Sequence, residues 1–235
     1  AGVRVTVRLY SIKEIRHGMV IGKSLYLPDG NLLLGAGFRI TEKILKSLID
    51  RGYTHLYIME KGTDEIIPED VISEELRQRA SSQLAAKVTE LRGAIQFKDL
   101  TYAKAKNLLE NGYLQQFNIA YELRQIVREI LDEISTTGAS FMRTLMTRSK
   151  GTFFFDHAVN TTVMAILIGA KYRFVRKELT SLALGTMLHD IGKIVLEQVE
   201  GEDVHDTSAP LYREHPTFGY LMVRNSPGIT SVEAQ

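Results

Sequence analysis

Apolar and polar residues follow two different periods along this chain, and the change falls near Pro68. Before it, valine alternates with a polar residue at 3–8, which is the period of a half-buried β-strand. Two short apolar stretches, 25–27 and 32–34, flank a Pro-Asp-Gly-Asn run that suits a tight turn. The pattern therefore predicts a strand over 3–8 and a β-hairpin over 25–34.

A helix and a further strand complete this first part of the chain. Thr41 can cap a helix that runs to about Arg51, and Gly52 is well placed to end it. The stretch 55–59 then predicts another strand. We expect a compact α/β module over 3–67 with no obvious chemistry.

After Pro68 the apolar positions recur every three or four residues, as they do in amphipathic helices. Long runs over 73–93 and 114–134, with shorter ones over 101–110 and 139–148, predict four helices. The two long runs either seal a helical bundle or pair two copies of the chain as a homodimer. The pattern alone does not choose between these two roles.

Two further helices are apolar nearly all round, which is typical of helices buried inside a bundle. They are predicted over 154–170 and 179–188, and Gly185 in the second allows a neighbour to approach closely. The fold class that follows is α+β overall, with a small N-terminal α/β module followed by an all-α bundle. The predicted parts are the module at 3–67, a helical connector at 68–111 and a helical domain at 112–235.

Composition limits the classes of function. With 235 residues, 44% of them hydrophobic, the chain can bury a sizeable core, and a net charge of +1 argues against binding a nucleic-acid polymer. It contains no cysteine, so any metal must be held by His, Asp, Glu and water. No apolar run reaches the roughly 18 residues of a membrane span. We therefore expect a cytoplasmic protein without membrane insertion.

The strongest chemical signal is the run His189-Asp190-Ile191-Gly192-Lys193. An imidazole next to a carboxylate suits Zn, Fe, Mn or Ni, and a carboxylate can bridge two ions. Two more histidines flank the run, His157 32 residues before His189 and His215 26 residues after it. His157 alone is explained as a core histidine, but the separations are long enough to bring ligands from other helices.

Local geometry limits how these residues can share a site. Consecutive helical residues point about 100° apart. His189 and Asp190 can therefore share a metal site only if they approach the metals from opposite sides, or if the helix loosens at these residues. Lys193 lies at i+3 and i+4 from them, which puts its ammonium over the same face. His215 precedes Pro216, which favours the start of a helix and leaves the imidazole able to reach a site.

Such a group suits phosphoester hydrolysis. A metal pair would acidify a bridging water, with Asp190 between the ions and neutral histidines as ligands. Lys193 would neutralise the substrate phosphate, and Gly192 would leave room for the substrate. His205, in an acidic loop-like stretch, is a weaker candidate. The basic turn at 171–177 gives three weaker phosphate contacts, for which a solvated turn is the simpler explanation: Arg173, Arg176 and Lys177.

Together, His157, the run at 189–193 and the His215-Pro216 pair resemble the HD superfamily of metal-dependent phosphohydrolases, in particular its HD-GYP branch. The resemblance covers about 112–225, and 4–59 is more weakly similar to a module often found before such domains. It implies an HD-type helical bundle, hydrolysis of the bacterial messenger cyclic di-GMP, and two divalent ions, iron or manganese. The residues implied are the metal ligands His157, His189, Asp190 and His215 and the phosphate contact Lys193, with Asp190 and Lys193 as the catalytic pair.

Two departures from the family pattern affect these expectations. Phe153 stands where some members have a glutamate that helps to hold a third metal, so we expect two metals at most. The family's later His-His pair, Gly-Tyr-Pro loop and further aspartate do not occur in these 235 residues. We therefore expect an HD domain that is incomplete at its C-terminus, from truncation, from partial representation or from degeneration. The alternatives are an HD phosphohydrolase of other nucleotides and a catalytically inactive signalling or scaffold module.

Overall fold

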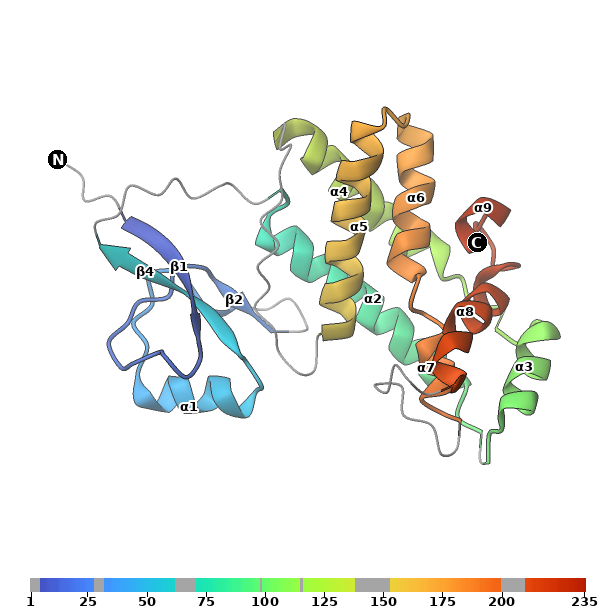
Figure 1. Ribbon diagram of the computed structural model, residues 1–235, viewed down its shortest axis with the longest axis horizontal. Coiled ribbons are helices and arrows are strands. Elements are labelled where there is room, and N and C mark those ends of the chain that lie inside the picture. The colour runs from blue at the N-terminus through green and yellow to red at the C-terminus, as the bar shows by residue number, and fades with distance from the viewer. Residues whose placement is uncertain are drawn as a thin grey trace. The chain divides into compact units, whose positions relative to one another are not determined.

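The computed structural model shows a chain that is mostly helical with a small strand-containing part, so its class is α+β (Figure 1). It falls into two compact units, whose boundaries lie inside three helices, after Ser82, after Thr136 and after His157. The three parts predicted from the sequence stay a prediction. The structure describes residues 5–27, 32–61, 71–97, 99–114, 116–137, 153–199 and 210–235.

Short antiparallel strands form the N-terminal part of the chain. The strand over 5–11 pairs with the strand over 55–61, with Leu9 opposite Tyr57, and the predicted hairpin pairs Leu25 with Leu34. The turn predicted at 28–31 lies outside the described residues. The strands and the helix that packs with them are β1 (Val5–Ser11), β2 (Leu25–Tyr26), β3 (Leu32–Leu34), α1 (Glu42–Asp50) and β4 (His55–Lys61).

The predicted boundaries of α1 are confirmed by its caps. The Thr41 hydroxyl accepts a hydrogen bond from the amide of Ile44, and Gly52 adopts a φ of +81° just beyond the helix. Apolar side chains from the strands, α1 and the segments that connect them form the core of this part. The fully buried members of that core are Ile15, Ile21, Leu25, Ile40, Leu48, Leu56 and Ile58.

The described chain from residue 71 onwards is mostly helical, and the predicted helices are confirmed except where residues are not described. The expected helix at 139–148 lies outside the described residues. The helix expected from 114 begins at Ala120, because the Asn118 carboxamide accepts from the amide of Tyr121 and starts the helix there. The helices are α2 (Glu74–Ala94), α3 (Tyr102–Glu110), α4 (Ala120–Thr137), α5 (Phe153–Lys171), α6 (Arg176–Leu188), α7 (Lys193–Leu196), η1 (Pro210–Glu214), α8 (His215–Val223) and α9 (Ser231–Ala234).

A buried carboxylate joins three of these helices. Both Glu233 oxygens on α9 accept from the Arg124 guanidinium on α4, at 2.8 Å each, and Ser181 on α6 donates to one of them at 3.0 Å. A Cβ added at Gly185 in α6 would lie 3.2 Å from the carbonyl oxygen of Glu233, which confirms the predicted close approach at this glycine. Burial alone would raise the pKa of Glu233, but these donors and Thr230 lower it from 4.5 to about 2.

One stretch of the described residues, Arg176–Leu196, is long and apolar enough by length and composition to cross a membrane. Over half of its apolar window, 56%, is buried inside the structure, and a turn at 189–192 interrupts the helix. Buried core helices pass the same test, so this stretch is weak support for a membrane span. The cytoplasmic location expected from composition stays a prediction.

We predict that Glu233→Gln lowers the free energy of unfolding by about 3 kcal/mol at pH 7, since the pKa is depressed by about 2.5 units on folding. A carboxylate whose pKa is lower in the folded state than in the unfolded state stabilises the fold at any pH above its unfolded pKa. The wild-type advantage is therefore full above about pH 4.5 and disappears as the pH falls towards 2. Urea unfolding of wild type and Glu233→Gln between pH 7 and pH 2.5 measures this difference in the free energy of unfolding.

Glu122→Gln is the matched control, because this α4 carboxylate is 54% exposed and lies 3.4 Å from Lys87. An exposed pair of this kind contributes at most about 1 kcal/mol. Equal effects of the two substitutions, or a difference between Glu233→Gln and wild type that does not change with pH, would contradict the assigned role of Glu233.

Candidate metal centre

Two antiparallel helices bring the first two predicted ligands together, because each ligand lies nearly the same number of residues from the turn between them. His157 lies near the start of α5, fourteen residues before Lys171, and Arg176 lies thirteen residues before His189. At 1.5 Å per residue the two arms of this hairpin differ by only about 1.5 Å. The helix α5 continues unbroken from Phe153 through His157 to Lys171.

The turn between these helices is tightly specified. The amides of Arg173 and Phe174 donate to the carbonyls of Ala170 and Gly169, at 2.9 and 3.0 Å, which is the pattern of a Schellman cap. Arg173 occupies the left-handed position of that cap with a φ of 62°. Gly169 also lets α6 approach, since a Cβ there would lie 2.8 Å from Leu179. The hairpin angle is thereby set by backbone bonds and by one missing side chain.

The regular α-helix ends at Leu188, and the chain tightens at the chemical motif instead of loosening as one of the two predicted routes to a shared site had it. Beyond His189 the amides bond three residues back, Ile191 to Leu188 at 2.9 Å and Lys193 to Asp190 at 3.0 Å. Such a turn has about three residues per turn instead of 3.6, so residues at i and i+3 lie above one another. This alignment places the Lys193 side chain over Asp190, where Nζ donates to Oδ2 at 2.6 Å.

Gly192 brings the third histidine into place. A Cβ on Gly192 would lie 2.0 Å from the carbonyl oxygen of His215 and 2.5 Å from the amide nitrogen of Gly219. The start of α8 therefore packs directly on the backbone of the turn. We expected Gly192 to leave room for a substrate, but the backbone of α8 fills that space. Its role is close packing, which carries His215 towards Asp190.

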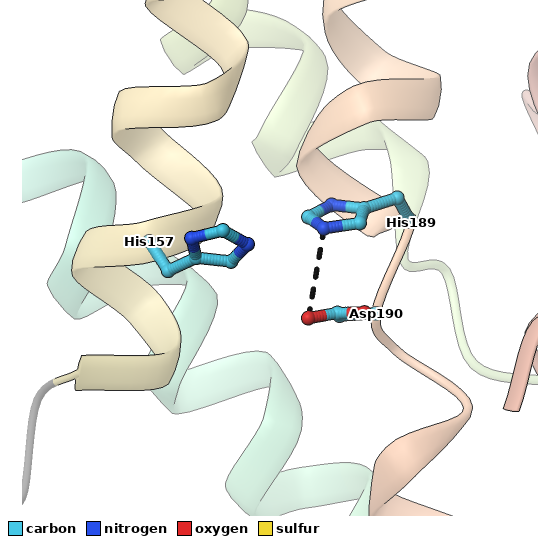
Figure 2. Close-up of side chains that lie close together, drawn as sticks. All are labelled: His157, His189 and Asp190. Carbon is cyan, nitrogen blue, oxygen red and sulfur yellow. Dashed lines mark ion pairs between the residues drawn. The ribbon is translucent and has the colours of Figure 1, made fainter. Parts of the chain in front are cut away.

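The Asp190 carboxylate is the centre of the resulting cluster. Its Oδ2 lies 3.5 Å from Nε2 of His189, and its Oδ1 lies 3.4 Å from Nε2 of His215. One ligand atom from each of His157, His189 and Asp190 lies within 4.8 Å of the other two. Figure 2 shows the His157 ring on α5 turned towards the His189–Asp190 pair at the end of α6. The structure thus brings together all four predicted ligand residues.

Backbone carbonyls orient two of the imidazoles. Nδ1 of His189 lies 2.7 Å from the carbonyl of Thr186, and Nδ1 of His215 lies 2.6 Å from that of Tyr212. Because a carbonyl only accepts, each Nδ1 carries a proton, and in the neutral imidazole Nε2 is then the nitrogen whose lone pair can bind a metal. In both cases the carbonyl is three residues before the histidine, so this orientation is a local property of the chain.

The donor set fits a divalent transition metal. Neutral imidazole nitrogen and carboxylate oxygen suit iron, manganese or zinc. Two ligands at about 2.1 Å from one tetrahedral ion lie about 3.4 Å apart, close to the separations between Asp190 and its two histidines. His157, His189 and Asp190 could therefore hold a metal ion, with His215 on the second carboxylate oxygen.

Tyr212, which the sequence reasoning missed, contacts two residues of the cluster. Its ring centroid lies 5.1 Å from that of His215, and Nζ of Lys193 lies 5.1 Å above the same ring. Burial lowers the pKa of Lys193, but attraction to Asp190 and Tyr212 outweighs burial, so the net pKa is raised. Lys193 therefore remains a cation at neutral pH.

The weaker phosphate candidates are not brought to the cluster. Arg173, Arg176 and Lys177 lie at the α5–α6 turn, about 20 Å along the helices from His157 and His189. All three are exposed, and Arg176 pairs with Asp132 of α4 at 2.6 Å. His205 falls outside the described residues.

We predict that Gly192→Ala weakens Mn²⁺ binding at least about tenfold and destabilises the chain by about 2–3 kcal/mol, because the new methyl displaces the start of α8. Gly93→Ala in α2 is the control, since a Cβ there meets nothing within 4 Å and alanine favours a helix by up to about 1 kcal/mol. Calorimetric metal titration and urea unfolding measure both effects. Unchanged metal affinity in Gly192→Ala would show that His215 does not depend on this contact.

Comparison with known proteins adds nothing to this geometry. No protein-family model, curated protein or solved structure matches the chain. The resemblance to the HD superfamily therefore stays a prediction, and the metal centre rests on the arrangement of its side chains.

Proposed function

We propose that this chain is a metal-dependent phosphohydrolase of the HD type. The observation that carries the proposal is the convergence of His157, His189 and Asp190, whose ligand atoms lie within 4.8 Å of one another. His215 reaches the other oxygen of the same carboxylate, 3.4 Å away. A carboxylate with an imidazole beside each oxygen supports a bridging role for Asp190, and hence two ions, as the family resemblance implies.

Each side chain then has a defined task. His189 and His215 present Nε2 because their Nδ1 protons are held by the carbonyls of Thr186 and Tyr212. Lys193 supplies a positive charge beside the cluster that can neutralise a phosphate as negative charge develops. Divalent ions held there would supply the Lewis acidity that polarises a phosphoryl oxygen and lowers the pKa of water.

Cyclic di-GMP is the substrate that we propose within this class, with iron or manganese as the metal. The residues at 157, 189–193 and 215 that carry the family resemblance are the ones that the fold gathers. The His189 side chain is 34% exposed and Asp190 only 9%, so the cluster is reached from the His189 side while its carboxylate stays shielded. This arrangement favours a site for a diffusing substrate over a purely structural metal.

The metal centre is tested by loading the chain with Mn²⁺, Fe²⁺ or Zn²⁺ and measuring bound metal after gel filtration. We predict stoichiometric metal in the wild type and at least about a hundredfold weaker binding in His189→Ala and Asp190→Asn, since each removes a ligand. His17→Ala is the control, because this exposed histidine lies in the N-terminal part. Equal metal content in all four proteins would contradict the assignment.

The substrate class is tested by giving the metal-loaded chain cyclic di-GMP, nucleoside monophosphates and a generic phosphodiester. We predict metal-dependent conversion of cyclic di-GMP to the linear dinucleotide or GMP, lost in Asp190→Asn. Preference for mononucleotides would favour an HD phosphohydrolase of other nucleotides. Stoichiometric metal without turnover of any phosphoester would contradict the enzymatic proposal and favour a signalling or scaffold role.

A further inference from the structure

Two groups compete for one oxygen of Asp190. Nζ of Lys193 donates to Oδ2 at 2.6 Å, and Nε2 of His189 lies 3.5 Å from the same oxygen. The pair is shielded, since the Asp190 side chain is 9% exposed and that of Lys193 is 18% exposed. The ammonium therefore occupies the side of the carboxylate to which His189 would bring a metal.

A shielded carboxylate needs a counter-charge, and here Lys193 supplies it. Removing one partner of a buried ion pair leaves an uncompensated charge, which is strongly destabilising. A divalent cation on Oδ2 would provide the same compensation. Both cations on one oxygen would repel each other across a few ångströms in surroundings of low dielectric constant. The carboxylate is thus better satisfied by either cation than by both.

We propose that Lys193 is an internal cation that competes with the divalent metal for Asp190, so that metal binding must displace its ammonium from Oδ2. The inference rests on the metal centre of the proposed function and adds an opposing role to the phosphate contact expected of Lys193. The displaced ammonium would still lie near Tyr212, whose ring is 5.1 Å from Nζ. Metal loading would thereby release the Lys193 charge for a substrate phosphate.

The competing explanation is that the pair only braces the turn between α6 and α7. Lys193 and Asp190 lie three residues apart, a spacing that brings side chains together in any tight helical turn. Under that explanation, removing the ammonium leaves metal affinity unchanged, or lowers it because the turn loosens. Competition predicts the opposite sign, so a binding measurement separates the two.

The experiment is a calorimetric titration of the metal-free chain with Mn²⁺ and with Zn²⁺ at pH 7.5. Competition predicts that Lys193→Met tightens binding by about tenfold or more, which corresponds to about 1.4 kcal/mol. Lys193→Gln, which keeps a polar donor but no charge, should also bind more tightly. Lys193→Arg retains the charge and should stay within about threefold of wild type. Unchanged or weaker binding in both uncharged variants would overturn the proposal.

Lys87→Met is the matched control. Lys87 also pairs with a carboxylate three residues away, with Nζ 2.9 Å from Glu90, and its side chain is 13% exposed. It removes the same charge from the protein without touching the cluster, so its metal affinity should equal that of wild type. Tighter binding in Lys87→Met would mean that net charge, and not the contact with Asp190, explains the result.

Thermal unfolding of the metal-free proteins tests the compensation directly. Lys193→Met should lower Tm when Asp190 is present and should have little effect in an Asp190→Asn background, where no carboxylate needs a partner. Equal losses of Tm in the two backgrounds would overturn the proposal. If wild type and Lys193→Met bind metal equally well, competition fails while the metal centre stands. If neither binds metal, the metal centre and the competition fail together.

Discussion

A carboxylate that is almost wholly removed from water must be matched by positive charge, and the organisation of this site follows from that requirement at Asp190. Its side chain is 9% exposed, yet its two oxygens are contacted by Lys193, His189 and His215. Burial makes each of these interactions stronger than it would be at the surface. The same burial makes the carboxylate a strong ligand for a cation when one replaces the ammonium.

Backbone geometry, more than side-chain contacts, creates this convergence. The α5–α6 hairpin returns the chain to the level of His157 because its arms differ by one residue in length. The turn after α6 tightens and aligns Lys193 with Asp190. Gly192 then lets the backbone of α8 approach until His215 reaches the carboxylate. Tyr102 on α3 supports that position, since its hydroxyl donates to Glu214 and its ring packs against Phe218.

Local signals were enough to predict most elements, whereas contacts between distant segments were not. Periodicity and caps gave α1 and α5 nearly at their observed bounds, because both depend on neighbouring residues. The ligand residues also followed from residue type and spacing. The close approach of Gly192 to His215 could not be predicted from residue type and spacing, since it arises from packing of α8 on the turn. The contribution of Tyr212 was missed for the same reason, because its ring and carbonyl matter only once the chain has folded.

The most direct measurement follows the imidazole nitrogens of ¹⁵N-histidine-labelled protein by NMR while Zn²⁺ is added. The account predicts that one ring nitrogen of His157, and Nε2 of both His189 and His215, shift as metal binds, while His17 and His55 keep their metal-free spectra. It further predicts that Nδ1 of His189 and His215 is protonated before and after binding. Unshifted signals from these three histidines, or a shift in only one of them, would contradict a shared metal centre at Asp190.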